Sequence, residues 1–399
     1  MGDKKRIAVI FGGQSSEHEV SRVSAESVLK NIDRDKYEVE MVGITKDGKW
    51  LSYDGPLGLI GSGEWQPLAE AKAKAEANRK AGSLAGGHGP IPGQISSKAG
   101  KEDCDCQPGP SDTSARGILA AAGAEKEDKK IDVVFPVLHG CNGEDGTIQG
   151  LFELAGVPYV GCGVLGSALG MDKGFAKIVF EKEGIPQGKY IVFTRKQIEQ
   201  DADSLIGQVE ALLTYPCFVK PSNAGSSVGV SKARDRRKLV EALHFAARYD
   251  RRILVEEFID GKEVECAVLG NSEPIASTAG EVIPCNEFYD YDAKYKSGDS
   301  SAVIIPANLP DAVIQKIRDY AVRAFKALDL AGLARVDFFV HKDTGEVYIN
   351  EVNTLPGFTR ISMYPKLWEA SGIPYPKLIE RLIELAVERF EDSKRDIGD

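Results

Sequence analysis

The sequence predicts a multidomain α/β protein, and three observations support this fold class. Short apolar segments alternate with helical segments, which is typical of a parallel sheet covered by helices on both faces. The chain has 399 residues, about two to three times the usual size of one domain. Hydrophobic residues make up 42% and charged residues 28% of the chain, which indicates a globular protein rather than a disordered one.

Charge and apolar content exclude several classes of function. The chain carries 50 Lys and Arg against 60 Asp and Glu, a net charge of −10, which disfavours nucleic acid or an anionic membrane as the main partner. Its apolar segments are far shorter than the ~20 residues that span a bilayer, and residues 7–11 are too short for a signal peptide. Seven scattered cysteines indicate no disulfide framework. We therefore expect a cytoplasmic protein.

The N-terminal part predicts strands that alternate with helices. A strand at 7–11 ends in two glycines, a helix follows at 16–32, and a second strand covers 37–44. A third strand at 131–138 leads through a Gly-rich turn into a helix at 146–155 and a buried strand at 157–160. This order predicts a parallel sheet.

Residues 66–130 differ in composition from the segments on either side. They are rich in Ala, Gly, Lys and Ser, with several Gly-Pro breaks. Residues 69–81 are expected to form a polar helix, and the rest is expected to be a flexible insertion. Cys104 and Cys106 lie within it without a second pair of ligands nearby, which disfavours a metal site.

From Asp172 onward the pattern changes to shorter strands and helices. Asp172 is expected to cap a helix that Gly184 ends. The predicted strands that follow cover 190–193, 217–220, 253–257, 263–269, 333–340 and 346–352. Helices are expected at 310–328 and 376–390, and a polar loop at 286–301.

The most informative pattern is the predicted hairpin around residues 343–345. A three-residue loop with Gly345 in the left-handed conformation places Asp337 opposite Glu351 and Arg335 opposite Asn353. All four side chains then project from one face, because side chains alternate along a strand. Opposed carboxylates repel each other unless a cation lies between them, and with the Asn oxygen they suit Mg²⁺. The alternative is a solvated strand face with a surface ion pair.

A Gly/Ser-rich loop follows the strand that ends at Lys220. The amides and hydroxyls of residues 220–229, Ser227 included, can hold phosphate oxygens while Lys220 supplies a positive charge. The segment does not match the Walker pattern, which disfavours an ordinary P-loop NTPase. A purely structural loop is the alternative, but beside a Mg²⁺-type face nucleotide binding explains the segment better.

Residues 161–166 match the dinucleotide-binding pattern G-x-G-x-x-G. The acidic residues about 20 positions later, Glu181 and Glu183, lie in a predicted helix and not at the end of a second strand. We therefore do not expect a dinucleotide site here.

Several charged residues at strand ends or in turns have a structural interpretation, a functional one or both. Glu256 can accept from an adenine amino group and Glu263 from a ribose hydroxyl, although both can also be surface charges. Glu144 is expected to stabilise a helix start together with Asp145. His139 ends a strand, where ligand sites of α/β proteins gather.

Several segments in order closely resemble the D-alanine–D-alanine ligase family, which has the ATP-grasp fold. The resemblance covers most of the chain except about 66–130 and is specific in combination. The segments that carry it are residues 10–21, 139–146, 171–173, 220–229, 288–295, 334–337, 350–359 and 361–367.

The resemblance implies an ATP-grasp fold of three domains. These are an N-terminal parallel-sheet α/β domain at 1–170 with the 66–130 insertion, a central α+β domain at 171–256 and a C-terminal α+β catalytic domain at 257–399. It implies ATP-dependent ligation of two D-alanines through an acyl phosphate, for peptidoglycan precursor synthesis. It further implies small-molecule substrates and a homodimer.

The resemblance also implies a role for each matching residue. For ATP, the implied contacts are Lys173 and Lys220 at the phosphates, Glu256 with the main chain near Glu257 and Ile259 at adenine, and Glu263 at ribose. Lys294 is a further implied ATP contact and lies with Tyr295 on the 286–301 loop, which would close over the site. Two Mg²⁺ ions, with Mn²⁺ as a substitute, would bind Asp337, Glu351 and Asn353. For the amino acids, the resemblance implies Glu17 at the first site, Ser362 and Met363 at the second, and His139 as a further substrate contact. It implies Arg335 and Gly357 at the oxyanion, and Ser226 and Tyr295 in a hydrogen-bonded chain with Glu17.

Two alternatives to a D-alanine–D-alanine ligase stay open at this point. One is a related ligase that uses D-lactate or D-serine as its second substrate; Tyr295 resembles the dipeptide-forming type, and Met363 lacks the positive charge associated with D-serine forms. Cys141 and Arg360 depart from the family pattern. The other alternative is a non-catalytic nucleotide-binding regulator, against which the complete Mg²⁺-type ligand set argues.

Overall fold

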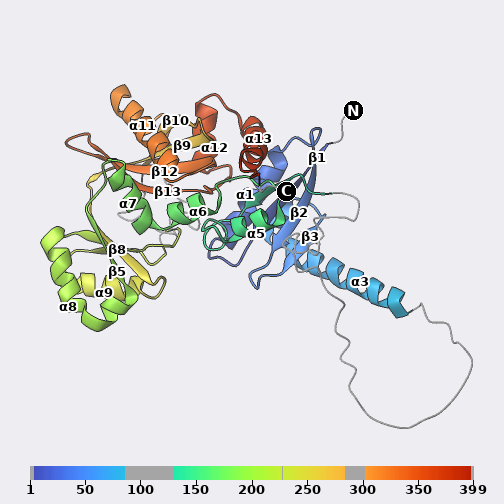
Figure 1. Ribbon diagram of the computed structural model, residues 1–399, viewed down its shortest axis with the longest axis horizontal. Coiled ribbons are helices and arrows are strands. Elements are labelled where there is room, and N and C mark those ends of the chain that lie inside the picture. Colours follow the sequence, from blue (N-terminus) through green and yellow to red (C-terminus); the bar gives the residue numbers. More distant parts are fainter. Residues whose placement is uncertain (1–3, 86–129, 227, 284–301, 397–399) are drawn as a thin grey trace, which may run out of the picture.

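A computed structural model describes residues 4–85, 130–226, 228–283 and 302–396 (Figure 1). The strands are β1 (Lys5–Gly12), β2 (Tyr37–Ile44), β3 (Trp50–Tyr53), β4 (Val133–Val137), β5 (Tyr190–Thr194), β6 (Cys217–Pro221), β7 (Ser231–Ala233), β8 (Arg252–Glu257), β9 (Gly261–Gly270), β10 (Ile275–Ile283), β11 (Ala302–Ile304), β12 (Gly332–His341) and β13 (Val347–Asn353). The helices are α1 (His18–Asn31), α2 (Gly58–Ser62), α3 (Trp65–Ala85), α5 (Thr147–Ala155), α6 (Val164–Met171), α7 (Lys173–Lys182), α8 (Arg195–Leu212), α9 (Arg236–Ala246), α11 (Asp311–Ala327), α12 (Met363–Ala370) and α13 (Tyr375–Asp392).

The N-terminal sheet has the order β3-β2-β1-β4, with β1 parallel to both β2 and β4. Residues 7–11 are fully buried and alternate between two cores. Ile7 and Val9 pack on the side of α1, whereas Ala8 and Ile10 pack on the side of α5. The predicted parallel sheet covered on both faces is thus formed by β2, β1 and β4, whereas the edge strand β3, which the sequence did not predict, pairs antiparallel with β2. The expected strand at 157–160 is reduced to a single bridge between Tyr159 and Val134.

Helix α3 is longer than the helix expected at 69–81 and anchors the start of the predicted insertion. Trp65 is 1% exposed, and its ring centroid lies 5.0 Å from that of Phe11 in β1. From there α3 extends away from the sheet (Figure 1). The rest of the predicted insertion, including Cys104 and Cys106, lies outside the described residues.

The central sheet is antiparallel, in the order β5-β8-β6-β7, and has its own hydrophobic core. Helices α8 and α9 cover it with apolar residues such as Ile206 and Leu239, which are fully buried. We call residues 190–257, from β5 to β8, the central unit. Its core shares no residue with the other cores of the described chain.

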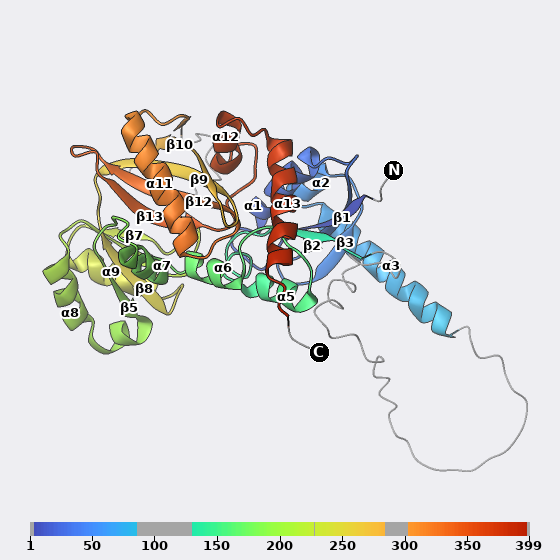
Figure 2. The ribbon, with the colours of Figure 1, turned by 45° about the horizontal axis from the view of Figure 1, so that its top comes forward.

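The C-terminal sheet is also antiparallel, in the order β11-β10-β9-β12-β13. Helix α11 covers one face, together with α7. Helices α12 and α13 cover the other face, and this core continues into the N-terminal sheet, where the rings of Phe358 and Phe135 lie 6.3 Å apart. Figure 2 shows α13 between the two sheets. We call the N-terminal and C-terminal sheets with their helices the joined body.

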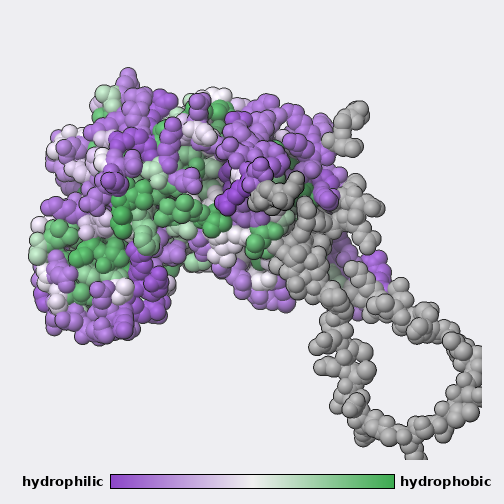
Figure 3. Space-filling view, viewed as in Figure 1, coloured by the Kyte–Doolittle hydropathy of each residue, from purple (hydrophilic) through white to green (hydrophobic). Residues whose placement is uncertain are grey.

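Apolar side chains gather on the exposed faces of α6 and α7, where Leu165 and Ile178 are more than half exposed (Figure 3).

Within the described part of the chain, every helix is too short or too polar to cross a membrane. Each of the three predicted domains contains one sheet, while the domain boundaries themselves stay a prediction.

Candidate active site

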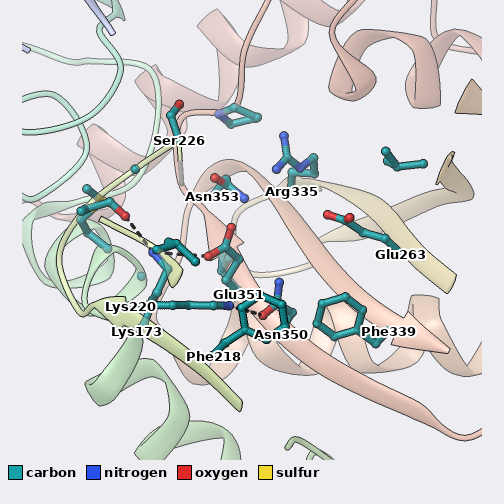
Figure 4. Close-up of a pocket in the computed structure, with 18 of the residues that line it drawn as sticks. Lys173, Phe218, Lys220, Ser226, Glu263, Arg335, Phe339, Asn350, Glu351 and Asn353 are labelled. Atoms are coloured by element: carbon teal, nitrogen blue, oxygen red, sulfur yellow. Dashed lines mark hydrogen bonds and ion pairs between the residues drawn. The ribbon is translucent and has the colours of Figure 1, made fainter. Parts of the chain in front are cut away.

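A cavity of about 470 Å³ lies where the central unit meets the joined body. Figure 4 shows residues from β6, β9, β12 and β13 that point into it. The predicted site residues that line it are Glu17, His139, Lys173, Lys220, Ser226, Glu256, Glu257, Ile259, Glu263, Arg335, Glu351, Asn353 and Gly357. The structure therefore brings together segments that are up to 340 positions apart, since 357 − 17 = 340.

The hairpin of β12 and β13 carries the charged face that the sequence predicts. Arg335 pairs with Asn353, and Asp337 pairs with Glu351. All four therefore project from the same face of the sheet. The predicted register is confirmed at the four residues that matter for the site.

The turn of this hairpin differs from the prediction. Val340 pairs with Val347 and the Gly345 amide donates to the His341 carbonyl, so the loop comprises residues 342–345 and not 343–345. Gly345 has a φ of +68°, as expected for a left-handed residue. The ladder shifts between Asp337 and Phe338, where Asn350 is an extra residue in β13. The predicted pairs form because this bulge compensates for the longer turn.

An arginine relieves the repulsion expected between the two opposed carboxylates. Arg335 donates from Nε and Nη2 to the two oxygens of Asp337, at 2.7 and 2.6 Å. Its Nε also lies 3.0 Å from Glu265 Oε2. Burial alone would lower the pKa of Arg335, but the carboxylates of Asp337 and Glu265 raise it well above its ordinary value. Asp337 is 2% exposed and, in the described structure, lies outside the cavity lining that Arg335 and Asn353 form.

The donor set on this face fits a hard divalent cation. Asp337 and Glu351 supply carboxylate oxygens, and Asn353, whose Nδ2 donates to Asp337 at 3.0 Å, supplies an amide oxygen. Lys173 Nζ lies 3.3 Å from Glu351 Oε2, so basic side chains already contact both carboxylates. The described residues contain no group of three or more Asp, Glu, His or Cys placed to hold a metal. Substrate phosphates would have to complete the coordination.

Lys220 and Lys173 project into the cavity from different elements. Lys220 lies one residue before the end of β6, forms an ion pair with Glu256, and its Nζ lies 3.4 Å from Asn350 Oδ1. Lys173 begins α7 and donates to the Ala224 carbonyl at 2.9 Å. Burial would lower the pKa of Lys220, but Glu256 and Glu351 raise it, so the side chain stays a cation. Two ammonium groups thus face the acidic strands.

Glu256 forms two ion pairs that its predicted contact with adenine does not require. Its Oε1 forms an ion pair with Lys220 and its Oε2 lies 3.1 Å from Lys177 Nζ. Burial would raise the pKa of Glu256, but these two ammonium groups lower it to about 2. The contact of Glu256 to adenine stays a prediction. Sequence analysis missed Lys177, because one lysine in a helix carries no signal by itself.

Three aromatic residues without an assigned role line the cavity, Phe218, Phe258 and Phe339. Phe218 lies in β6 two residues before Lys220, and Phe339 lies in β12 two residues after Asp337. Figure 4 shows the rings of Phe218 and Phe339 beside the strand that carries Asn350 and Glu351. Period-two alternation from Lys220 and Asp337 places them on the functional faces and could have found them. Flat apolar walls of this kind suit a nucleotide base.

Glu17 connects the N-terminal sheet to the Gly/Ser loop of the central unit. Its carboxylate accepts a hydrogen bond from Ser226, as the predicted chain requires. A Cβ atom on Gly140 or Gly225 would lie 2.8 or 2.6 Å from Glu17 Oε2, so glycine at both positions permits the close approach. Tyr295, the third member of the predicted chain, lies outside the described residues, as do Ser227 and Lys294.

The prediction that Glu144 acts as a helix-capping residue is wrong. Asp145 accepts from the Asn142 and Thr147 amides at 2.9 and 3.1 Å, but Glu144 is buried, lines the cavity and lies 3.6 Å from His139 Nδ1. Burial raises the pKa of Glu144. Burial would lower the pKa of His139, but the Glu144 carboxylate raises it above its ordinary value. The error arose because both acidic residues stand equally close to the helix start in sequence.

The residues predicted for the second amino-acid site lie next to the cavity. Ser362 Oγ accepts from the Thr359 amide at 3.0 Å, and a Cβ on Gly357 would lie 2.9 Å from it. Met363 is 7% exposed and packs against Gly280 in the core of the joined body. Neither Ser362 nor Met363 lines the cavity of the described chain, so their contact with substrate stays a prediction.

Comparisons with known proteins agree with this arrangement. Two family models match, the D-ala D-ala ligase N-terminus at residues 6–162 and the D-ala D-ala ligase C-terminus at residues 179–384. The chain is 63% identical over 394 residues to a D-alanine–D-alanine ligase of Ruminiclostridium cellulolyticum, covering 98% of both proteins. It is 50% identical to one of Thermoanaerobacter sp. over 99% of both.

Solved structures of similar proteins have the same fold. The VanG D-Ala:D-Ser ligase from Enterococcus faecalis matches with a TM-score of 0.75 and 37% identity, over 96% of this chain and all of that one. The D-alanine–D-alanine ligase from Coxiella burnetii matches with a TM-score of 0.71 and 32% identity, over 98% of this chain and 96% of that one. The chain has the ATP-grasp fold and belongs to the D-alanine–D-alanine ligase family.

Proposed function

We propose that the protein ligates two D-alanines into D-alanyl-D-alanine with hydrolysis of ATP to ADP and phosphate, for the synthesis of peptidoglycan precursors. The observation that carries this proposal is the arrangement across the cavity. Lys173 and Lys220 line the cavity together with Glu351 and Asn353 of β13, and Asp337 lies buried opposite Glu351 in β12. A site of this kind positions a phosphoryl group between cations and neutralises its charge.

In the first step, the carboxylate of the first D-alanine attacks the γ-phosphorus of ATP, giving an acyl phosphate and ADP. Lys173 and Lys220 stabilise the charge on the phosphate oxygens. Glu17, held by Ser226, binds the ammonium group of this D-alanine. Phe218, Phe339 and Glu263 support the base and the ribose of the nucleotide.

The residues of the acidic face would hold Mg²⁺. Asp337, Glu351 and Asn353 are its proposed ligands, and the bound metal would supply Lewis-acid stabilisation of the charge on the phosphoryl group. Arg335 donates to both oxygens of Asp337, and because each carboxylate oxygen has two lone pairs, Oδ1 would keep one for the metal. Glu265 is a second carboxylate partner of Arg335.

In the second step, the amino group of the second D-alanine attacks the carbonyl carbon of the acyl phosphate and phosphate leaves. Arg335 and the Gly357 amide, which both line the cavity, are proposed to stabilise the oxyanion. Lys294 and Tyr295 are proposed to belong to a loop that keeps water from the acyl phosphate. Ser362 and Met363 are proposed to adjoin the second amino acid.

The choice of the second substrate separates this proposal from its alternative, ligation of D-alanine to D-serine or D-lactate. We propose that the Tyr295 hydroxyl favours an amine over a hydroxyl nucleophile. Tyr295→Phe should then weaken dipeptide synthesis and allow D-alanyl-D-lactate to form, most clearly below neutral pH, where the competing amine is more fully protonated. Product analysis with both acceptors from pH 6 to 8 tests this, and a mutant that makes only dipeptide contradicts it.

The test of the function is ADP release together with product identification. With ATP, Mg²⁺ and D-alanine alone, we expect ADP and D-alanyl-D-alanine in equal amounts. Adding D-serine or D-lactate should leave the dipeptide of D-alanine as the main product. ADP release that requires D-serine or D-lactate would favour the alternative, and ATP binding without any ligation would favour a non-catalytic regulator. Sedimentation of the active protein tests the proposed homodimer.

A further inference from the structure

Lys177 is a buried cation for which the proposed reaction has no role. It is 2% exposed and lies in α7, whose neighbouring residues Ala176 and Phe180 pack in the core beneath the C-terminal sheet. Its Nζ lies 3.1 Å from Glu256 Oε2 and 5.5 Å from the centroid of the Tyr190 ring. A buried ammonium group is strongly destabilising unless it is paired, so the ion pair with Glu256 is what allows a lysine at this position.

The pairing joins two parts of the molecule. Glu256 belongs to β8 of the central unit, whereas α7 packs with the joined body. Lys173 and Lys177 are four residues apart, so they project from the same side of α7, one helical turn apart. Lys173 lines the cavity and Lys177 stands behind Glu256, outside the cavity lining of the described chain.

Lys177, Lys220 and Glu256 form a cluster whose net charge depends on Lys177. Lys220 and Glu256 alone form an ion pair with no net charge, which would leave the phosphate site without the positive charge of Lys220. Lys177 takes the second oxygen of Glu256, and the three side chains together carry one net positive charge. The side chain that faces the cavity and holds this charge toward a ligand is Lys220.

We propose that Lys177 is a positioning residue for the nucleotide: by engaging Glu256 from behind, it keeps Lys220 in place as an effective cation for the phosphates. The proposal deepens the proposed function and rests on it for the identity of the nucleotide. It assigns Lys177 no contact with substrate.

The first test replaces the charge and keeps the volume. In Lys177→Met, we expect the KM for ATP and the Kd for ADP to rise about tenfold, with the KM for D-alanine and kcat within about threefold of the parent. Lys177→Arg, which keeps a cation able to reach Glu256, should recover most of the affinity. Lys182→Met is the matched control, because Lys182 is an exposed lysine of the same helix and should leave all constants unchanged.

The second test restores the charge balance without the lysine. In the double variant Lys177→Met with Glu256→Gln, Lys220 again faces the cavity with one net positive charge. We expect Lys177→Met to change the Kd for ADP by less than about threefold when it is made in the Glu256→Gln variant, so that any loss of the predicted adenine contact of Glu256 cancels from the comparison. A purely structural role of Lys177 predicts the opposite, because two substitutions in one buried cluster should weaken the protein more than one.

Each result decides the proposal. A normal KM for ATP in folded Lys177→Met overturns it, and so does a loss of ADP affinity on Lys177→Met that is as large in the Glu256→Gln variant as in the parent. If Lys177→Met does not fold, Lys177→Gln tests the same loss of charge while keeping a hydrogen bond to Glu256. Calorimetry of ADP binding needs no turnover, so a failure of the proposed ligation and a failure of the role of Lys177 are measured separately.

Discussion

The joined body and the central unit lie on opposite sides of the cavity and are built differently. In the joined body, one hydrophobic core runs from β1 through Phe135 and Phe358 to the C-terminal sheet. The central unit has a core of its own. Across the cavity the two are linked by polar contacts, such as the hydrogen bond between Ser226 and Glu17 and the 3.4 Å contact between Lys220 and Asn350.

This difference indicates which part of the site is held rigidly. The proposed metal ligands and Arg335 stand on strands of the joined body, where a continuous core fixes the backbone. Lys220 and the Gly/Ser loop stand on the central unit. Polar contacts of this kind exchange readily with water or substrate, whereas separating a packed core exposes apolar surface. We therefore expect the central unit, and not the joined body, to adjust its position when the nucleotide binds.

The largest effect is expected for a substitution that removes the negative charge of Asp337, which lies on a strand of the joined body. Asp337→Asn should lower turnover by at least about a thousandfold, because it removes a proposed Mg²⁺ ligand. Its effect on stability should be a loss of about 1–3 kcal/mol, since the variant breaks the paired hydrogen bonds to Arg335. The sequence alone suggested the opposite sign, from relief of the repulsion with Glu351.

ADP release against Mg²⁺ concentration and urea unfolding measure both effects. Asp343→Asn, an exposed aspartate in the turn of the same hairpin, is the matched control and should change neither quantity. Near-normal turnover of Asp337→Asn at ordinary Mg²⁺ would show that the assignment of the metal ligands is wrong.

Core substitutions test whether the two regions unfold separately. Phe358→Ala removes a ring that packs against Phe135, Tyr364 and Tyr375 and should lower stability by about 3–5 kcal/mol. Leu239→Ala in the central unit should cost about 2–5 kcal/mol. In hydrogen exchange, the first should speed exchange in both β1 and β12, and the second only within residues 190–257. Identical exchange patterns would argue against two separate cores.

The ion pairs of Glu256 should appear in the pH dependence of stability. Its pKa of about 2 in the folded protein is below its ordinary value of 4.5, so the stabilisation is complete above pH 4.5 and is lost as the pH falls toward 2. Parent and Glu256→Gln should therefore differ by up to about 3 kcal/mol above pH 4.5, with the gap narrowing in acid. Urea unfolding from pH 6 to pH 3 measures this, with exposed Glu199→Gln as the control. A gap that does not depend on pH would contradict it.

The smallest effect is expected for the segment that follows α3. Replacing residues 86–123 with a short Gly/Ser linker should leave D-alanine-dependent turnover within about threefold, because its composition provides little apolar surface to bury. The buried part of α3, with Trp65 and Ala69, is retained in this variant. Complete loss of turnover in a folded deletion variant would show that the segment takes part in the reaction.

The sequence by itself determined the parts of the protein that depend on local periodicity. The apolar run at 7–11, the cap at Asp172, which accepts from the Phe175 amide at 3.1 Å, and the facing of Asp337 with Glu351 were all predicted. Each follows from a repeat of two or 3.6 residues or from a single capping residue. The resemblance to the ligase family added the reaction and a role for each of the predicted residues that line the cavity.

Only the tertiary structure decided which charges meet. Arg335 binds Asp337 on both oxygens, Glu144 pairs with His139 instead of capping a helix, and Lys177 shares Glu256 with Lys220. The bulge at Asn350 was also decided by the tertiary structure. It restores the pairing of Asp337 with Glu351, which the longer turn would have shifted by one residue. A side chain's partner depends on where distant segments pack and on how deeply they bury it, because burial is what makes an unpaired charge costly. Periodicity along the chain contains no such information.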